Sequence, residues 1–152
     1  MRAIVMAACM AVLAIACQWD RVVYYHYEPV SDGWLDGDTM KFNLPVLEQA
    51  AHYQVSLEWR YTEAYPYRSL KLLVKNNLDD SLQWVSDTVT CFLRNENGIA
   101  CGEGISAMYQ LSVPLGEYAS DGSQCASVHI THCMDTYSIE GLCDIGIKIE
   151  RR

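Results

Sequence analysis

The sequence predicts an all-β domain, either an antiparallel β-sandwich (jelly-roll or immunoglobulin-like) with about eight strands or a flattened barrel. Three observations favour this fold class. Apolar and polar residues alternate with a period of two, which is typical of half-buried strands. Clusters rich in Gly, Asp, Asn and Ser separate the alternating segments, as tight turns do. Segments with the 3.6-residue period of an amphipathic helix are scarce.

The alternation is clearest at residues 53–60, where Tyr53, Val55, Leu57 and Trp59 would face the core. A helical signal occurs at residues 45–52, as one short turn with Pro45 near its start. Residues 102–104 (GEG) indicate a bulge or turn. The expected strands are, in chain order, 22–27, 40–44, 53–60, 70–75, 88–94, 108–113, 126–132 and 145–149.

Tyr65-Pro66-Tyr67 lies between the strands expected at 53–60 and 70–75. Proline restricts the backbone of the residue before it and favours a turn there. We therefore expect a tight aromatic corner, with Pro66 outside any paired strand.

The N-terminal segment indicates export and lipidation. Arg2 precedes an uncharged stretch, residues 3–16, that is too short to span a bilayer as a helix and is typical of a signal peptide. The residues that follow, LAIAC at 13–17, resemble a bacterial lipobox, so Cys17 would be diacylated and become the new N-terminus. The alternative is ordinary cleavage after Ala14 or Ala16. The predicted organisation is a signal peptide at 1–16, a lipidated tether at 17–22 and a β-sandwich domain at 23–152.

The chain is acidic, with 11 basic and 19 acidic residues and a formal net charge of −8. Removal of residues 1–16 takes away one basic residue, so the mature charge is about −9. The sequence shows no basic stripe of the kind that nucleic acids require, so a nucleic-acid partner is not expected. We expect attachment to the membrane through the N-terminal lipid and not through the protein surface, most simply at the outer membrane.

Five cysteines follow Cys17, and an exported domain meets an oxidising compartment in which disulfides form. A three-residue hairpin loop at 95–97 would place Leu93 opposite Ile99 and Cys91 opposite Cys101, within bridging distance. Cys133 and Cys143 are the second expected pair. The alternative is that several of these cysteines are buried as small hydrophobic residues.

The sequence contains no motif for a nucleophilic serine, a bound phosphate, a dinucleotide or zinc, so an enzyme is not expected. His129 and His132 would point to opposite faces of one strand and could not share a metal ion. We therefore expect no catalytic residue, no metal, no cofactor and no small-molecule ligand.

The aromatic composition indicates binding more strongly than any motif indicates catalysis. The chain has four Trp and ten Tyr but only two Phe, and amphipathic rings favour sites where a partner or ligand binds. Trp59, Trp84, Tyr65 and Tyr67 could form a stacking platform for sugars. Such a platform requires coplanar, exposed rings on one sheet face. The alternative is that these aromatic residues fill the core and rim of a thin sandwich.

The order of motifs resembles the GldH family of gliding-motility lipoproteins from the Bacteroidetes over nearly all of the mature chain. The resemblance rests on the lipobox cysteine and on the segments 57–61 (LEWRY), 65–70 (YPYRSL), 116–118 (GEY) and 141–150 (GLCDIGIKIE). It implies a non-enzymatic envelope lipoprotein associated with the gliding machinery and with the type 9 secretion apparatus. We expect the protein to face the periplasm and to contact other envelope proteins. It supplies no catalytic residue.

Overall fold

The computed structural model describes residues 21–47, 50–80, 82–123 and 125–152. The predicted signal peptide, Cys17 and the tether up to residue 20 lie outside the described residues. The strands are β1 (Val22–Pro29), β2 (Trp34–Leu35), β3 (Thr39–Asn43), β4 (Ala51–Thr62), β5 (Ser69–Asn76), β6 (Val85–Phe92), β7 (Glu103–Ile105), β8 (Met108–Ser120), β9 (Ser127–His132), β10 (Ser138–Ile139) and β11 (Leu142–Arg151).

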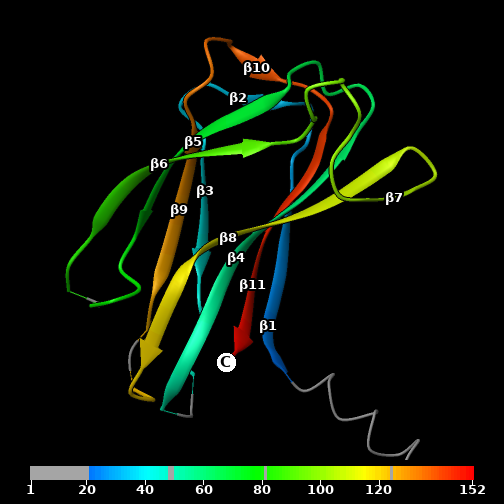
Figure 1. The fold of residues 1–152 in the computed structure, drawn as a ribbon. Helices are drawn as coiled ribbons and strands as arrows, with labels where there is room; N and C mark the ends of the chain where they lie inside the picture. The colour runs from blue at the N-terminus through cyan, green and yellow to red at the C-terminus, as the bar shows by residue number, and fades with distance from the viewer. Residues whose placement is uncertain (1–20, 48–49, 81, 124) are drawn as a thin grey trace, which may run out of the picture.

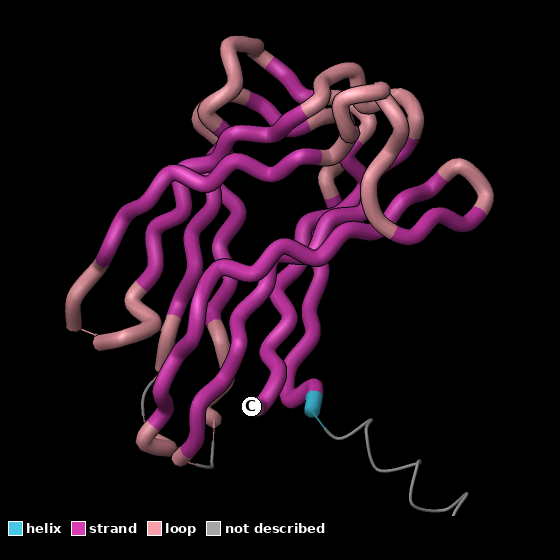
Figure 2. Tube along the Cα trace, viewed as in Figure 1, coloured by secondary structure: helices cyan, strands magenta, loops and turns pink. Residues whose placement is uncertain are grey.

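Two antiparallel sheets form the two layers of the molecule (Figure 1). One sheet has the strand order β1-β11-β4-β8-β7, the other has the order β3-β9-β5-β6, and β10 pairs with β2 at one end. Strands account for most of the described chain, as Figure 2 shows. The predicted all-β, antiparallel sandwich is therefore confirmed.

The core lies between the two sheets and follows the alternation in the sequence. Tyr53, Val55, Leu57 and Trp59 are almost completely buried, as predicted for the inner face of β4. Phe42, Leu70, Leu72, Val128 and Ile130 form the opposing layer. Because successive side chains of a strand point to opposite faces, the two-residue alternation of apolar and polar residues sets the register of every long strand.

All eight predicted strands are present, and three short strands are added. β2 and β10 have two residues each, which is too short to give a periodic signal. Residues 102–104 were expected to form a bulge or turn, but residues 103–105 form β7 and pair with Met108–Gln110 of β8. The helical turn expected at 45–52 is wrong over the described part of that range, because residues 45–47 are irregular and β4 already begins at Ala51.

The aromatic corner between β4 and β5 is confirmed. Pro66 lies outside the paired strands, and the Tyr65 hydroxyl donates a hydrogen bond to the Ser69 carbonyl (2.9 Å). Arg94, which follows β6, fixes the corner by donating hydrogen bonds to the carbonyl oxygens of Glu63 (3.0 Å) and Tyr65 (3.3 Å), and the corner joins β4 of one sheet to β5 of the other. The corner therefore ties the two layers together.

The cysteines do not form the expected pairs. The residues after β6 fold so that Arg94 lies opposite Ala100, and the Cys101 amide donates to the Leu93 carbonyl (2.8 Å). The register predicted for this hairpin is therefore wrong by two residues, and Cys91 instead lies opposite Leu70 of β5. Cys91, Cys101, Cys125, Cys133 and Cys143 are all free thiols in the structure.

The second expected pair, Cys133–Cys143, is separated by the architecture. Cys133 follows β9 and donates its amide to Lys71 of β5, whereas Cys143 is part of β11 in the other sheet. Burial raises the pKa of the Cys91 thiol to about 11, so this cysteine behaves as a neutral, buried side chain. The alternative interpretation, a cysteine used as a small hydrophobic residue, is correct for Cys91.

Candidate functional site

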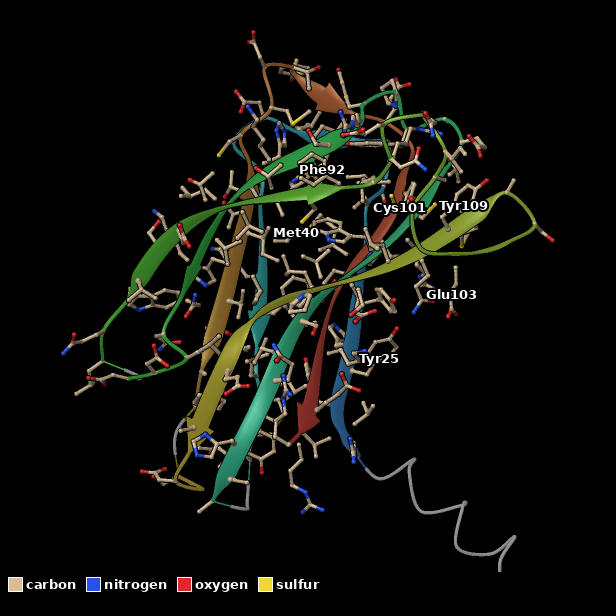
Figure 3. All side chains as sticks on the ribbon, viewed as in Figure 1. Tyr25, Met40, Phe92, Cys101, Glu103 and Tyr109 are labelled. Atoms are coloured by element: carbon tan, nitrogen blue, oxygen red, sulfur yellow. The ribbon has the colours of Figure 1, made fainter. Side chains whose placement is uncertain are left out.

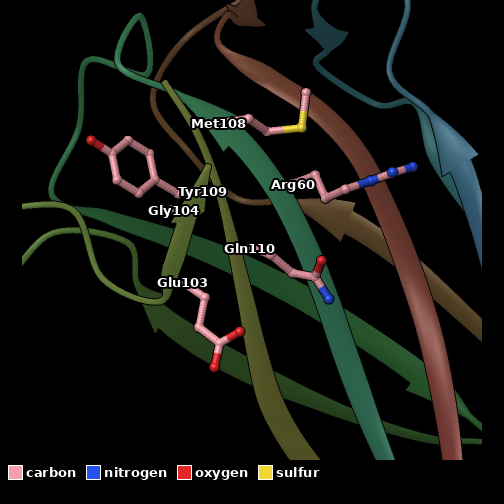
Figure 4. A pocket seen from close by; sticks show the side chains of 6 residues that line it. All are labelled: Arg60, Glu103, Gly104, Met108, Tyr109 and Gln110. Carbon is pink, nitrogen blue, oxygen red and sulfur yellow. The ribbon is translucent and has the colours of Figure 1, made fainter. Parts of the chain in front are cut away.

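A hollow lies on the outer face of the β1-β11-β4-β8-β7 sheet, where the β7–β8 hairpin extends beyond the sandwich (Figures 1 and 4). It has a volume of about 360 Å³ and is half open to solvent. A second hollow of about 290 Å³ continues along β8 and shares Glu103 and Gln110 with the first. The first hollow, called here the hairpin hollow, is lined by Arg60, Glu103, Gly104, Met108, Tyr109 and Gln110.

Three residues with positive φ angles shape the hairpin above the hollow. Ser106 and Ala107 both have positive φ, as the two central residues of a tight primed turn require. Gly102 has a φ of +90°, and a Cβ atom there would lie 2.1 Å from the Gln110 carbonyl oxygen. Glycine at this position therefore lets β7 approach β8 and hold Glu103 over the sheet.

A buried ion pair lies beside the hollow. The Glu58 carboxylate is almost fully buried although it is on the outer face of β4. It accepts a hydrogen bond from the Ser112 hydroxyl (2.5 Å) and lies 3.4 Å from the Lys148 ammonium, which also contacts Glu150 at 3.2 Å. The two carboxylates raise the pKa of Lys148 although its partial burial acts in the opposite direction.

Two tyrosines of β1 cover this ion pair. The Tyr27 ring lies against Gly146, where a Cβ atom would lie 2.6 Å from the ring. The Arg60 guanidinium lies 4.1 Å from the centre of the same ring, and the hydroxyls of Tyr25 and Tyr27 are 2.7 Å apart. Gln110 donates to the Tyr25 hydroxyl (3.1 Å) and so links β1 to the hollow. Burial and the hydrogen bond with Tyr25 raise the pKa of Tyr27.

The hollow is therefore lined by a carboxylate, an amide, an aromatic ring and the Arg60 side chain, whose guanidinium is paired with Asp144 (3.0 Å). Figure 3 labels Tyr25, Glu103 and Tyr109 at this side of the sheet. Within the described ranges, no three His, Cys, Asp or Glu side chains are close enough together to hold a metal ion. Hydrogen-bonding and charged groups of this kind are typical of the polar rim of a protein–protein interface.

We predict that Lys148→Met lowers the free energy of unfolding by about 2–3 kcal/mol, because it leaves the Glu58 charge buried without its partner. The effect is at the lower end for a buried pair, since the Lys148 side chain is 22% exposed and water reaches it. Urea unfolding at pH 7 measures the change. In the double variant Glu58→Gln/Lys148→Met no buried charge is unpaired, so we expect most of the loss to be restored. Equal losses in both variants would contradict this account.

The four aromatic residues considered as a sugar platform are not brought together. Trp59 and Tyr65 are at most 1% exposed and belong to the core. Tyr67 is half-buried and meets Tyr65 edge to face, with ring centres 5.8 Å apart. Trp84 is half exposed, lies just before β6, and packs on His129 of β9 in the same sheet. The core interpretation is correct for two of them, because both lie on inward positions or at the corner.

The two histidines of β9 point to opposite faces, as predicted. His132 is buried and its ring meets Trp34 edge to face at 5.3 Å. His129 faces outward, between Lys41 and Lys75. The residues of the hairpin hollow were not predicted, because Glu103 and Gln110 carry no motif and Tyr25 reaches them only through sheet pairing.

The fold and the hollow define a small antiparallel β-sandwich that presents a polar, half-open depression beside an extended hairpin. No helix in the part of the chain that the structure describes has the length and apolarity needed to cross a membrane. A family model for the GldH lipoprotein matches residues 22–149. The chain therefore belongs to the GldH lipoprotein family, whose members are linked to gliding motility, and the resemblance in the sequence is confirmed.

Two individual proteins show how far this similarity extends. The gliding motility lipoprotein GldH of Flavobacterium johnsoniae is 25% identical over 149 residues, covering 93% of this chain and 92% of the relative. Among solved structures, the VP2 subviral particle of infectious bursal disease virus is 11% identical, with a TM-score of 0.31. That match covers 88% of this chain and 33% of the viral chain. A likeness this loose carries no argument about function.

Proposed function

We propose that this protein is a non-enzymatic accessory lipoprotein of the gliding machinery, working beside the type 9 secretion apparatus by contacting other envelope proteins. The observation that carries the proposal is the family match, which extends over the whole sandwich from residue 22 to residue 149. The hairpin hollow supports a contact role, since its donors and acceptors are arranged for binding and include no nucleophile beside a general base.

We also propose that residues 1–16 are a signal peptide, that Cys17 carries the lipid and that residues 17–22 form the tether to the sandwich. The proposed location is the outer membrane, with the sandwich facing the periplasm. β1 begins at Val22, the last residue of the proposed tether, so the lipid would be attached close to one end of the sandwich. More than one acyl chain on Cys17 would give stable anchoring, because each buried CH₂ contributes about 0.8 kcal/mol.

We predict that Cys17→Ala moves the protein from the membrane fraction to the periplasmic fraction and removes the mass added by the acyl chains. Mass spectrometry of the fractionated protein measures both changes. Cys9→Ala is the matched control, because it replaces a cysteine of the signal peptide that carries no lipid in this proposal. Membrane retention of the Cys17→Ala protein would contradict lipid anchoring at this residue.

Crosslinking of the lipidated protein in intact cells tests the contact role. We expect capture of envelope proteins of the gliding machinery, and weaker capture when Glu103→Ala and Gln110→Ala are combined in the hairpin hollow. Loss of gliding in the deletion strain, restored by the wild-type gene, is the expected cellular result. Turnover of a substrate by the purified protein, or unchanged gliding after deletion, would contradict the proposal.

A further inference from the structure

The outer face of the β3-β9-β5-β6 sheet has a charge opposite to that of the whole chain. Its outward strand positions carry Lys41, Lys71, Lys75 and His129, several Ser and Thr hydroxyls, and neither Asp nor Glu. The three lysines are exposed and take part in none of the ion pairs found within the described segments. This surface, called here the basic face, was not evident from the sequence because Lys41 belongs to β3, whereas Lys71 and Lys75 belong to β5.

Three of these groups form one row across the sheet. Lys41 of β3 lies opposite His129 of β9, and His129 lies opposite Lys75 of β5. Neighbouring strands are about 4.8 Å apart, so Lys41 and Lys75 lie two strand spacings, about 10 Å, apart on either side of His129. Burial, Lys41 and Lys75 lower the pKa of His129, so the histidine is mainly neutral at pH 7 between two uncompensated ammonium groups. A row of this kind is relieved when an anion binds to it.

An aromatic ring lies beside the row. The Trp84 ring centre is 4.6 Å from that of His129, and half of the Trp84 surface is exposed. Hydroxyl side chains surround the row, with Ser86 opposite Lys75 and Thr131 hydrogen bonded to Thr39 (2.9 Å). The centre of a protein–protein interface is usually apolar and depleted of charge. A polar row with a single exposed indole is better suited to a hydrophilic chain.

We propose that the basic face binds an acidic polysaccharide, with Lys41 and Lys75 contacting its acid groups and Trp84 packing on a sugar ring. A glycan chain can follow the row from Lys41 to Lys75, because the outward strand positions of this sheet carry neither Asp nor Glu. This proposal concerns a different face from the hairpin hollow and does not depend on the role in gliding.

The test uses the full-length lipidated protein in a non-ionic detergent and isothermal titration with galacturonate oligomers at low salt. We expect binding that weakens as salt is raised, because these exposed charges are screened. The double variant Lys41→Gln/Lys75→Gln is expected to weaken it about tenfold or more, and Trp84→Ala severalfold. Arg21→Gln/Arg152→Gln removes two exposed positive charges next to the ends of β1 and β11 in the other sheet and is expected to change affinity less than twofold. Thermal unfolding confirms that each variant is folded.

Four outcomes would overturn the proposal. They are no binding to the galacturonate oligomers, equal binding of a neutral glucan of the same length, tighter binding of polyglutamate at equal charge, and binding only to vesicles containing phosphatidylglycerol. Polyglutamate would indicate an acidic protein partner, and the vesicles would indicate a membrane surface. Equal weakening in the Arg21→Gln/Arg152→Gln control would likewise overturn the proposal, because overall charge and not this face would then be responsible.

Discussion

Gly141→Ala is expected to lower the free energy of unfolding by about 3 kcal/mol or more, which is a large effect for one methyl group. Gly141 has a φ of +79°, a region that L-residues adopt at a cost of about 1–2 kcal/mol. In addition, a Cβ atom would lie 2.2 Å from the Tyr65 amide nitrogen and 2.5 Å from its Cα atom. These are backbone atoms of the aromatic corner, so no side-chain rotation relieves the overlap. The corner or the start of β11 must move.

Gly37→Ala separates the cost of the positive φ angle from the cost of the steric overlap with the Tyr65 backbone. Gly37 has nearly the same φ, +82°, but nothing lies within 4 Å of the position of an added Cβ atom. We expect Gly37→Ala to lose only the conformational part, about 1–2 kcal/mol. Urea unfolding of both variants at equal pH measures the difference. Similar losses in the two variants would show that the contact between Gly141 and the Tyr65 backbone does not limit the packing of the corner.

This contact shows where sequence reasoning reaches its limit. The corner itself was predictable, because Pro66 cannot continue a paired strand and its neighbours are aromatic. That residues 64–65 pack on Gly141 was not, because the two segments are brought together only when β11 pairs with β4. The same limit explains the wrong hairpin register near Cys101, where loop conformation rather than residue pattern decides which residues are opposed.

The long strands could be predicted because the alternation of apolar and polar residues within each strand indicates which of its side chains are buried. In β9, Val128 and Ile130 alternate with outward residues, and the structure shows this alternation directly. No local sequence pattern marks the residues of the two proposed binding surfaces. Lys41 and Lys75 are ordinary surface residues in their own strands, and only the pairing of both strands with β9 makes them flank His129. Glu58 likewise finds Lys148 only through the β4–β11 register.

Trp59→Ala is expected to lower the free energy of unfolding by about 3–5 kcal/mol, the range for removal of a large buried aromatic side chain. Trp59 is fully buried at the centre of β4, with its ring 6.4 Å from that of Trp34. Its indole N–H points toward the Cys91 sulfur, which is a weak hydrogen-bond acceptor. Nearly all of the lost free energy therefore comes from packing. If Trp59→Ala does not fold, Trp59→Phe supplies the measurement, with a smaller loss expected.

Trp84→Ala is the matched control, because the same chemical change is made at a ring that is 50% exposed and packs mainly on His129. We expect it to change the free energy of unfolding by less than about 1 kcal/mol, as surface substitutions usually do. The two variants therefore separate a structural tryptophan from one that is available to a partner. Comparable losses at both positions would mean that Trp84 is part of the packed structure, and the aromatic contribution to the basic face would then have to be abandoned.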